Sequence, residues 1–527
     1  MIRINNIRLP LNFDDKTVRR AVCRELRLDD SAVKSAVIFR RSVDARKKDD
    51  VHFLCTIDAK LNTNEDKVLR RAKNAAKALP YRYDVPKWNG GASPVIVGFG
   101  PAGMFAALVL AQSGAKPIVI ERGKDVDSRT ADVQSFWSGG ILNTESNVQF
   151  GEGGAGTFSD GKLNTGTKDS RQRKVLEEFV LHGAPDDILI NAKPHIGTDK
   201  LKDTVKNIRE EIIKLGGRVL FETKLTGLEI KDNKICSALY ERNGEKGRID
   251  TDSVILAIGH SARDTFEMLD SMALPLEAKP FSVGARIEHL REKTDRAQYG
   301  KFAGNKRLGA AYYKMNVRTA DGRGAYTFCM CPGGVVVNAS SEDGRLCTNG
   351  MSEFARDGVN SNAALLVGVA PEDFKSSSPL AGVEFQRDLE QKAFETGGGF
   401  NAPVQRVEDF LNNRKSAFLG EVKPSIAPGY SLSNLNDILP EAVSGGMKQA
   451  IASMGKRLSG FDDGDAVLTG PETRSSSPVR ILRNAETLQS ISVAGLYPCG
   501  EGAGYAGGII SAAVDGIKCA EQIIKIH

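Results

Sequence analysis

The chain lacks the features of a membrane, secreted or disulfide-stapled protein. No uninterrupted apolar run reaches the length of a transmembrane helix, and residues 1–10 do not have the composition of a signal peptide. Only eight of the 527 residues are cysteine, and their irregular spacing predicts reduced thiols. We therefore expect a cytoplasmic protein that makes no membrane contact.

Histidine is also scarce. The chain has six histidines and no H-E-x-x-H motif, so we predict no dedicated metal site. Cys329 and Cys331 form a C-x-C motif in an apolar context. This pair leaves metal binding or a disulfide open, beside the simpler interpretation that both residues are buried free thiols.

Positive charge is concentrated at the N-terminal end. Residues 1–90 hold 21 Lys and Arg against 12 Asp and Glu, so the remainder of the totals, 72 and 66, is 51 against 54. A basic surface can bind nucleic acid or an acidic partner. Because aromatic residues are not interleaved with the basic ones, as base stacking needs, we favour a solvated lid or docking domain.

A glycine-rich turn joins two apolar strands through a helix in residues 94–123. The first strand covers residues 95–97, the sequence G-x-G-x-x-G follows, and a helix runs from Met104 to about Ser113. The second strand ends in Glu121. This order is typical of a dinucleotide-binding unit, in which the turn and the helix N-terminus approach a pyrophosphate and the acid accepts hydrogen bonds from a ribose.

A second unit of this kind lies near the C-terminus. A strand over residues 491–498 leads into a glycine-rich segment, and a helix from Ile509 to about Ile526 closes the chain. Glu501 follows the strand and can hold a ribityl hydroxyl. The helix N-terminus can stabilise a ring that becomes anionic on reduction. The two units together predict one extended dinucleotide that is held from both sides.

Residues 150–163 form a third glycine-dense segment. Its glycines suit a backbone that lies against a planar ring or a phosphate, and Thr157, Ser159 and Lys162 supply donors. Apolar residues at positions 150, 158 and 163 anchor the segment, so we favour ligand contact over a flexible loop.

These patterns predict an α/β protein of four segments. Residues 1–90 form a basic α+β domain of βαββα order whose last helix spans residues 65–79. Residues 91–280 and 471–527 form two parts of a nucleotide-binding domain. Residues 281–470 form an inserted α+β substrate domain with an antiparallel sheet. Its predicted strands are Ser282–His289, Ala310–Arg318, Ala325–Cys331, Val335–Ser340 and Ala364–Val369.

The motifs together carry a family resemblance. They read VIVGFGPAGMFAAL, VIERG, GEGGAGTFSDGKL, VILAIGHSARDTF and GLYPCGEGAGYAGGIISAAVDG. With them the chain resembles the uncharacterised bacterial FAD-dependent dehydrogenases, described as NAD(FAD)-utilising dehydrogenases, of the glutathione-reductase-like flavoprotein fold. The resemblance covers most of residues 93–527, and the N-terminal domain resembles the family's extra domain. It implies FAD as cofactor and a Rossmann-like FAD-binding domain.

The resemblance also implies contacts with FAD. The first glycine turn would meet the pyrophosphate, Glu121 and Arg122 the adenosine, Leu225 the adenine, and Glu501 the ribityl chain. Together with the glycine segments, the predicted cofactor residues are Gly98, Gly100, Pro101, Ala102, Gly103, Glu121, Arg122, Gly154, Gly156, Thr157, Ser159, Lys162, Leu163, Leu225, Ala257, Gly259, Gly500, Glu501, Gly507, Gly508 and Ile509.

Only one clear G-x-G-x-x-G sequence is present, which argues against a second, nicotinamide-binding domain. Either the substrate reduces the flavin directly, or NAD(P)H binds transiently as a co-substrate. The flavin carries the hydride chemistry, so protein groups need only orient the substrate and move a proton. The candidates for these roles are His260, Arg263, Arg286, Arg474 and Tyr505.

Arg286 and Arg474 could clamp an anionic substrate, or they could be ordinary ion-paired arginines. Arg263 is expected near the cofactor from its place in the chain order. His260 could equally be a packing histidine. We expect an FAD-dependent oxidoreductase that acts on an unidentified small molecule. The alternatives are an RNA-linked flavoprotein that uses the basic N-terminal domain, and a flavin-binding protein without turnover.

Overall fold

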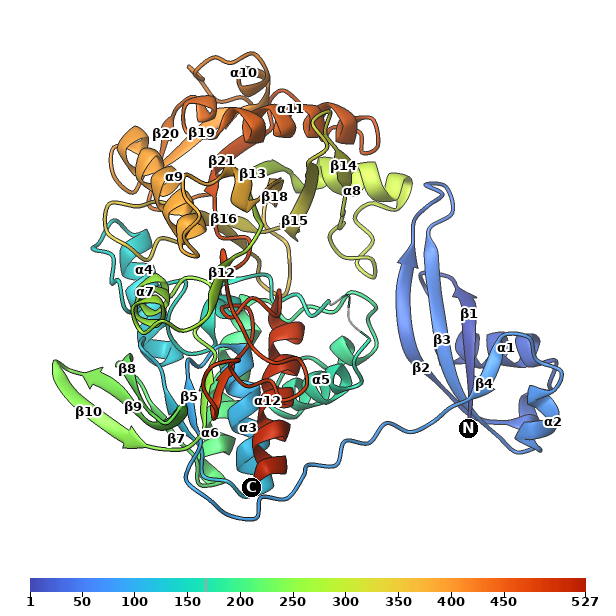
Figure 1. Ribbon diagram of the computed structural model, residues 1–527. Helices are drawn as coiled ribbons and strands as arrows, with labels where there is room; N and C mark the ends of the chain where they lie inside the picture. The colour runs from blue at the N-terminus through green and yellow to red at the C-terminus, as the bar shows by residue number, and fades with distance from the viewer. Residues whose placement is uncertain (165, 167) are drawn as a thin grey trace.

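The computed structural model describes residues 1–164, 166 and 168–527. Figure 1 shows an α/β body, a cap above it that is built around a larger sheet, and a small N-terminal domain beside both. Residues 78–94 contain no helix or strand and connect the N-terminal domain to the body.

The centre of the body is a five-stranded parallel sheet of order β23-β11-β5-β6-β7. Every residue of β5, β11 and β23 is buried, as in a parallel sheet covered on both faces. The sheet therefore brings the two predicted glycine-rich units side by side. Its strands are β5 (Val95–Val97), β6 (Ile118–Ile120), β7 (Arg218–Leu220), β11 (Val254–Leu256) and β23 (Leu496–Pro498).

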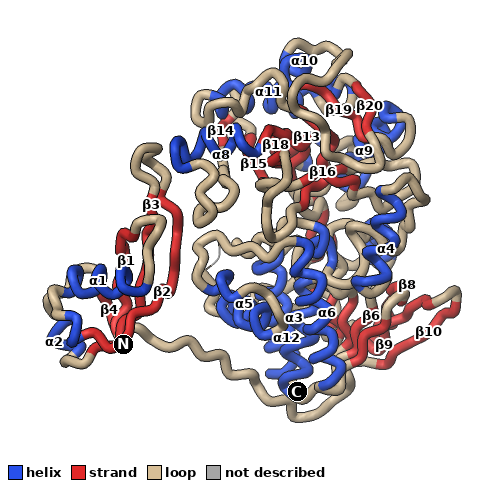
Figure 2. The backbone as a smooth tube through the Cα atoms, turned by 180° about the vertical axis from the view of Figure 1, so that it is seen from behind, coloured by secondary structure: helices blue, strands red, loops and turns tan. Residues whose placement is uncertain are grey.

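Helices of the body gather beside this sheet (Figure 2). They are α3 (Pro101–Ser113), α5 (Arg171–Leu181), α6 (Thr198–Lys214) and α12 (Ile509–Ile526). α3 and α12 cross very closely, because a Cβ added at Gly516 would lie 2.0 Å from the carbonyl oxygen of Ala102. Only glycine fits at that crossing.

A three-stranded antiparallel meander extends from the body. Its first two strands, β8 (Thr223–Lys231) and β9 (Lys234–Arg242), form a hairpin with positive φ angles at Asp232 and Asn233 in the turn. A third strand, β10 (Glu245–Asp250), pairs with β9 and was not predicted. Its sequence, EKGRID, has almost no apolar residues, so the strand depends on pairing rather than on burial.

The cap contains a seven-stranded sheet of order β14-β15-β18-β13-β21-β19-β20, antiparallel except between β19 and β20. Helices α9 (Ala381–Gly397) and α11 (Glu441–Gly455) pack on it. The strands are β13 (Phe281–Leu290), β14 (Asn316–Arg318), β15 (Gly324–Cys331), β18 (Asn360–Val369), β19 (Ala402–Arg406), β20 (Tyr430–Leu432) and β21 (Val467–Glu472).

Two predicted cap strands differ from the structure. The segment predicted as a strand over 310–318 is regular only in β14, and residues 310–315 form no strand although Tyr313 and Met315 are buried in the cap core. The second, over 335–340, is β16 (Val335–Asn338), which pairs with β17 (Thr348–Met351) outside the large sheet. Apolar runs predict burial in both places, but they do not predict the pairing partner.

The remaining helices and strands connect the layers. They are α4 (Val126–Trp137), α7 (Arg263–Ser271), α8 (Arg291–Tyr299), α10 (Val407–Leu411) and the antiparallel pair β12 (Leu276–Ala278) and β22 (Val479–Ile481).

The N-terminal domain is a four-stranded sheet of order β2-β3-β1-β4 with two helices. The Asp14 side chain caps α1 by accepting a hydrogen bond from the backbone N–H of Thr17 at 2.7 Å. The elements are β1 (Ile2–Leu9), α1 (Asp15–Leu26), β2 (Val33–Asp44), β3 (His52–Leu61), α2 (Glu65–Leu69) and β4 (Ala75–Lys77).

The predicted helix over residues 65–79 is wrong in its length. α2 ends at Leu69, and β4 then pairs with the edge of β1, opposite Ile2 to Ile4. Residues 70–79 are rich in alanine and lysine, which favour a helix locally. Strand pairing at an open sheet edge overrides that weak preference.

The N-terminal domain docks on the body and the cap. The backbone of Arg41 in β2 donates to the carbonyl of Ile190 at 2.7 Å and accepts from the N–H of Ala192 at 2.8 Å. The Lys48 ammonium donates to the carbonyl of Gln298, at the end of α8, at 2.6 Å. β2, at the edge of the N-terminal sheet, therefore pairs with residues 190–192 of the body.

Among the residues that the structure describes, no helix combines the length and the apolar character that crossing a bilayer requires.

Gly516→Ala tests the crossing of α3 and α12. The added methyl collides with the backbone at Ala102, so we expect a loss of about 1–3 kcal/mol in the free energy of unfolding. Gly445→Ala in α11 is the control, because its Cβ would meet nothing within 4 Å and the helix should gain up to about 1 kcal/mol. Denaturant unfolding of both variants measures the difference, and equal stabilities would contradict the close crossing.

Candidate functional site

A cavity of about 330 Å³ lies where the carboxyl ends of the parallel strands meet the cap. All three predicted glycine segments contribute to its wall. The predicted cofactor residues that line it are Gly98, Gly100, Pro101, Ala102, Glu121, Arg122, Gly154, Gly156, Ser159, Lys162, Leu225, Ala257, Gly259, Glu501, Gly507, Gly508 and Ile509.

The first glycine turn has the predicted geometry. Gly98 has φ +96°, and a Cβ there would lie 2.4 Å from the carbonyl oxygen of Ala257 on the neighbouring strand. A Cβ at Gly103 would lie 1.9 Å from the carbonyl oxygen of Gly98. Gly103 therefore allows the helix to pack on the strand, but it does not line the cavity, so the structure does not support the predicted direct contact with pyrophosphate.

Two helix N-termini open into the cavity. α3 begins after Gly100 and α12 after Gly508, and neither N-cap residue has a side-chain hydrogen bond to the helix. Their first N–H groups are therefore available to an anionic ligand, and the helix dipoles favour negative charge there. Residues of both helix starts, Ala102 and Ile509, lie on the cavity wall. This donor set fits a dinucleotide with a diphosphate and a reducible ring.

Glu121 is buried at the end of β6, as the motif predicts. Its carboxylate accepts hydrogen bonds from the backbone N–H groups of Phe99, Gly123 and Gly151, at 2.7, 2.9 and 3.0 Å. A carboxylate can accept about four hydrogen bonds, so one position remains for a ribose hydroxyl. Glu121 thus joins the first and third glycine segments, a role that the sequence did not predict.

Arg122 lies on the same wall. Its guanidinium pairs with Asp264 at 2.8 Å and with Glu145 at 2.7 Å, and it stacks over the ring of Phe150 at 4.2 Å. The side chain is held in place before any ligand binds.

The third glycine segment packs against the first. A Cβ at Gly154, where φ is +61°, would lie 2.9 Å from the Cα of Gly100. Thr157 and Leu163 are buried away from the cavity, and the Thr157 hydroxyl donates to the carbonyl of Glu152 at 3.1 Å. The structure therefore does not support their prediction as contact residues, since they anchor the loop.

Lys162 lies on the cavity wall with its ammonium 2.9 Å from the carboxylate of Asp160. Burial by itself would lower the pKa of Lys162, but the carboxylate of Asp160 and two nearby cysteine sulfurs raise it. Arg356 also pairs with Asp160, so a buried charge network holds Lys162 in position.

Glu501 is half-buried at the opposite side of the cavity. Burial raises the pKa of its carboxyl to about 7, although a hydrogen bond from the backbone N–H of Gly508 at 3.3 Å opposes this. Gly500 does not line the cavity; its N–H donates to Asp515 at 2.7 Å, and a Cβ there would lie 2.7 Å from that of Ala102. Gly500 is therefore a packing residue.

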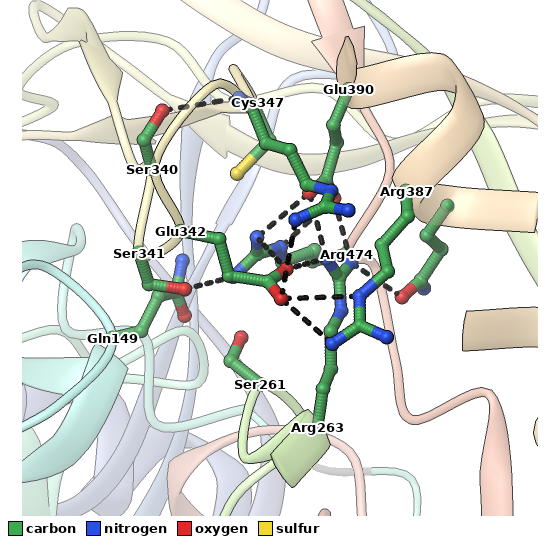
Figure 3. A network of polar contacts seen from close by, with 12 residues as sticks. Gln149, Ser261, Arg263, Ser340, Ser341, Glu342, Cys347, Arg387, Glu390 and Arg474 are labelled. Carbon is green, nitrogen blue, oxygen red and sulfur yellow. Dashed lines mark hydrogen bonds and ion pairs between the residues drawn. The ribbon is translucent and has the colours of Figure 1, made fainter. Parts of the chain in front are cut away.

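Three predicted arginines are ion-paired and buried. Arg286 is fully buried and pairs with Glu472, whose Oε1 lies 3.0 Å from its Nη2. Figure 3 shows Arg263 and Arg474 turned toward the carboxylate of Glu390, which each contacts at 2.8 Å. Arg263 and Arg286 do not line the main cavity, so the structure does not support a substrate clamp formed by Arg286 or direct substrate contact by Arg263 there.

The Glu390 network joins the body to the cap. Arg263 begins α7 of the body, whereas Glu390 lies in α9 and Arg474 follows β21 of the cap (Figure 3). Glu342 pairs with Arg263 and, at 2.8 Å, with Arg387. Arg474 also lines the cavity, so this network sets the distance between the cap and the cofactor side of the body.

Of the two other catalytic candidates, only His260 lines the cavity. His260 lies on the cavity wall, with Nδ1 2.9 Å from the hydroxyl of Ser261, and burial together with Arg474 and Arg263 lowers its pKa to about 4. Its imidazole is therefore neutral near neutral pH. Tyr505 does not line the cavity; Arg483 stacks 3.9 Å from its ring, and the hydroxyl accepts from the N–H of Arg483.

The cap supplies wall residues that sequence reasoning missed. They are Tyr312, Lys314, Thr327, Phe328, Cys329, Thr348, Asn349 and Glu472. Only Cys329 carried a sequence signal, the C-x-C motif. The others come from cap strands and from the irregular segment 310–315, whose relation to the glycine turns depends on how the cap folds over the body.

One group among the described residues has the spacing of metal ligands, namely Cys499, Asp515 and Cys519. Arg483 already pairs with Asp515 at 2.7 Å and lies 3.8 Å from the sulfur of Cys519. A guanidinium in that position competes with a cation for the same ligands.

Family comparisons identify the cofactor. Residues 280–475 match the family described as FAD-dependent protein, C-terminal domain-like, and residues 93–157 match an FAD binding domain. Residues 1–60 match a domain of unknown function. FAD is therefore the cofactor of this protein, and the first glycine turn lies within the matched FAD binding domain.

A curated protein of Clostridium beijerinckii, described as uncharacterized, is 50% identical over 531 residues and covers 99% of this chain and 98% of its own length. Solved structures are more distant. A triple mutant of the flavin-dependent brominase Bmp2 has 13% identity, a TM-score of 0.38 and coverage of 82% and 80%. A geranylgeranyl bacteriochlorophyll reductase-like protein of Thermoplasma acidophilum has 13% identity, a TM-score of 0.37 and coverage of 82% and 78%.

Glu390→Gln tests the charge network between the body and the cap. It leaves two buried arginines without their carboxylate, so we expect a loss of about 3–5 kcal/mol in the free energy of unfolding at neutral pH. Glu384→Gln, on the same helix, removes an exposed partner of Arg387 and should cost at most about 1 kcal/mol.

The pH dependence checks the same network. Burial alone would raise the pKa of Glu390, but Arg263 and Arg474 hold it well below its usual value of 4.5. A lowered folded-state pKa stabilises the protein above the unfolded value, and this stability is lost as the pH falls. The difference between wild type and Glu390→Gln should therefore shrink below about pH 4.5. A difference that grows there would contradict the ion pairing.

Gly100→Ala tests the cofactor turn. Its Cβ would lie 3.6 Å from the Cα of Gly154, an ordinary contact, so folding should be unaffected. The methyl group enters the cavity, and we expect FAD affinity to fall about tenfold or more, or about 1.4 kcal/mol. FAD titration by calorimetry measures the change, with Gly445→Ala as control. Unchanged affinity would exclude a close approach of the ligand at Gly100.

Proposed function

The chain belongs to the family of the Clostridium beijerinckii protein, and we propose that it is an FAD-dependent oxidoreductase that transfers hydride between the flavin and a small molecule. The observation that carries this proposal is the shared cavity. The uncapped starts of α3 and α12 open on one side of it, and cap residues form the opposite wall.

The body supports a glutathione-reductase-type arrangement of the FAD-binding domain. A five-stranded parallel sheet carries the first glycine turn, an antiparallel meander follows, and the C-terminal strand returns beside β11. Within this arrangement, the N-terminus of α3 would bind the diphosphate of FAD, and the N-terminus of α12 would contact the flavin ring. Glu501, at the start of the turn before α12, serves the ribityl chain.

The cap wall forms the substrate side of the site. Tyr312, Phe328 and Cys329 bound the space there with aromatic and sulfur surface, and the Lys314 ammonium adds a positive charge. FAD, when bound, supplies a hydride acceptor or donor. His260 is neutral in the cavity because its pKa lies near 4, and its Nδ1 is oriented by Ser261. The neutral imidazole can orient a substrate hydroxyl or amine through a hydrogen bond.

We infer a docking role, rather than RNA binding, for the N-terminal domain. Two contacts support docking: the backbone pairing of Arg41 with residues 190–192 and the hydrogen bond from Lys48 to Gln298. Part of its positive charge is also neutralised internally, as in the pairs of Arg3 with Asp58 and of Arg19 with Asp30. Salt-dependent RNA retention that is lost with residues 1–90 would favour the alternative.

Anaerobic mixing of the FAD-loaded protein with NADH, NADPH and a panel of metabolites tests the oxidoreductase function. We expect at least one donor to bleach the flavin absorbance in a saturable manner. Free FAD at the same concentration, mixed with the same donor, is the control and should stay oxidised. If no donor bleaches a flavin that dithionite does reduce, the protein binds flavin without this turnover.

A further inference from the structure

A bulge in β15 presents one cysteine to the cavity. The pairing of β15 with β18 shifts register between Phe328 and Cys331, and Cys329 adopts φ +41° there. A positive φ is unusual for cysteine and persists only where the surroundings enforce it. Cys329 lines the cavity, whereas Cys331 is fully buried behind it. The strand is therefore irregular at the cysteine that lines the cavity.

A buried arginine holds this bulge. Nη1 of Arg286 donates to the carbonyl of Cys329 at 2.8 Å and lies 3.9 Å from the sulfur of Cys331. Its guanidinium is fixed in turn by Asn349 at 2.9 Å and Asn362 at 3.1 Å. The role of Arg286 is thus to position the C-x-C segment.

The two thiols lie on the same side of the strand and interact. The Cys331 thiol also donates to the carbonyl of Cys329, with sulfur and oxygen 3.2 Å apart. Hydrogen bonding from Cys331 holds the pKa of Cys329 well below its usual range, against the effect of burial, and Lys162 and Arg286 act in the same direction. The pKa of Cys331 is raised by its burial and by its partner. Of the two thiols, Cys329 is therefore the one that loses its proton more readily.

Cys329 lines the same cavity as Glu501 and Lys162. Its sulfur is close enough to Glu501 to raise the pKa of that carboxyl, and Glu501 precedes the start of α12. Lys162, from the third glycine segment, is within electrostatic reach of both cysteine sulfurs. The outer thiol is therefore surrounded by the groups expected to contact the ring end of FAD.

We propose that Cys329 and Cys331 form a redox-active dithiol facing the FAD cavity, with Cys329 as the nucleophile toward small-molecule disulfides and Cys331 as the resolving thiol. The proposal deepens the proposed function and rests on it, since it names the substrate class of the same cavity.

The exchange balances without a further reactant. The Cys329 thiolate attacks one sulfur of the substrate disulfide, forms a mixed disulfide and expels the first substrate thiolate. Cys331 then attacks the sulfur of Cys329, the second substrate thiolate leaves, and the proton of Cys331 passes to a leaving thiolate. The protein dithiol loses two electrons, and the substrate disulfide gains two.

Peptide mapping by mass spectrometry tests the dithiol in the FAD-loaded protein. We expect incubation with oxidised glutathione to produce a link between Cys329 and Cys331 and to release two glutathione thiols per chain. Cys331→Ser should stop at a mixed disulfide on Cys329, and Cys329→Ser should leave Cys331 unmodified. Cys236→Ser, which removes an exposed cysteine outside the cavity, is the control and should behave as wild type.

Two results would overturn the proposal. One is a Cys329 that stays free in folded wild-type protein while Cys236 reacts. The other is modification of Cys331 in Cys329→Ser at the wild-type rate. Thiol mapping does not depend on turnover. If a donor bleaches the flavin but no Cys329–Cys331 link forms, only the dithiol proposal is wrong. If the link forms but no donor bleaches the flavin, the proposed hydride transfer is wrong instead.

Discussion

The site depends on the close crossing of α3 and α12. These helices begin at opposite ends of the sequence, yet Gly516 allows the backbone of α12 to touch the carbonyl of Ala102 in the first turn of α3. A side chain at Gly516 would push the helices apart by the width of a methyl group. Since both helix N-termini open into one cavity, this contact sets the spacing at which two sets of N–H groups can meet a single dinucleotide.

The cap is held over this cavity by charge rather than by apolar contact alone. Glu390 of the cap lies between Arg263 of the body and Arg474 of the cap, and all three side chains are almost completely buried. A buried carboxylate is costly unless it is paired and hydrogen-bonded, and here two guanidinium groups meet it. Such a network has one low-energy geometry, so it also fixes how the C-x-C bulge of β15 faces the cofactor side.

The predictable part of the site follows local rules. The turn at Gly98, the helix packing at Gly103 and the acid at Glu121 each result from a strand, a turn and a helix that are adjacent in sequence. Local rules could not distinguish the residues that line the cavity from those that pack behind it and support the loops. Thr157, Leu163 and Gly500 stand within glycine-rich motifs, but they pack behind the cavity, because a loop needs anchors as well as contact residues.

The sequence by itself determined the parallel sheet, the two helix starts and a bound dinucleotide, because those depend on short-range spacing of glycine, apolar runs and one acid. The family resemblance of its motifs implied that this dinucleotide is FAD. Tertiary structure decided the rest. It paired the arginines at 263, 286 and 474 with carboxylates, turned residues 75–77 into an edge strand, and brought Cys329 to the cofactor cavity. Each of these depends on contacts between residues far apart in the chain, and local propensity and spacing carry no information about such contacts.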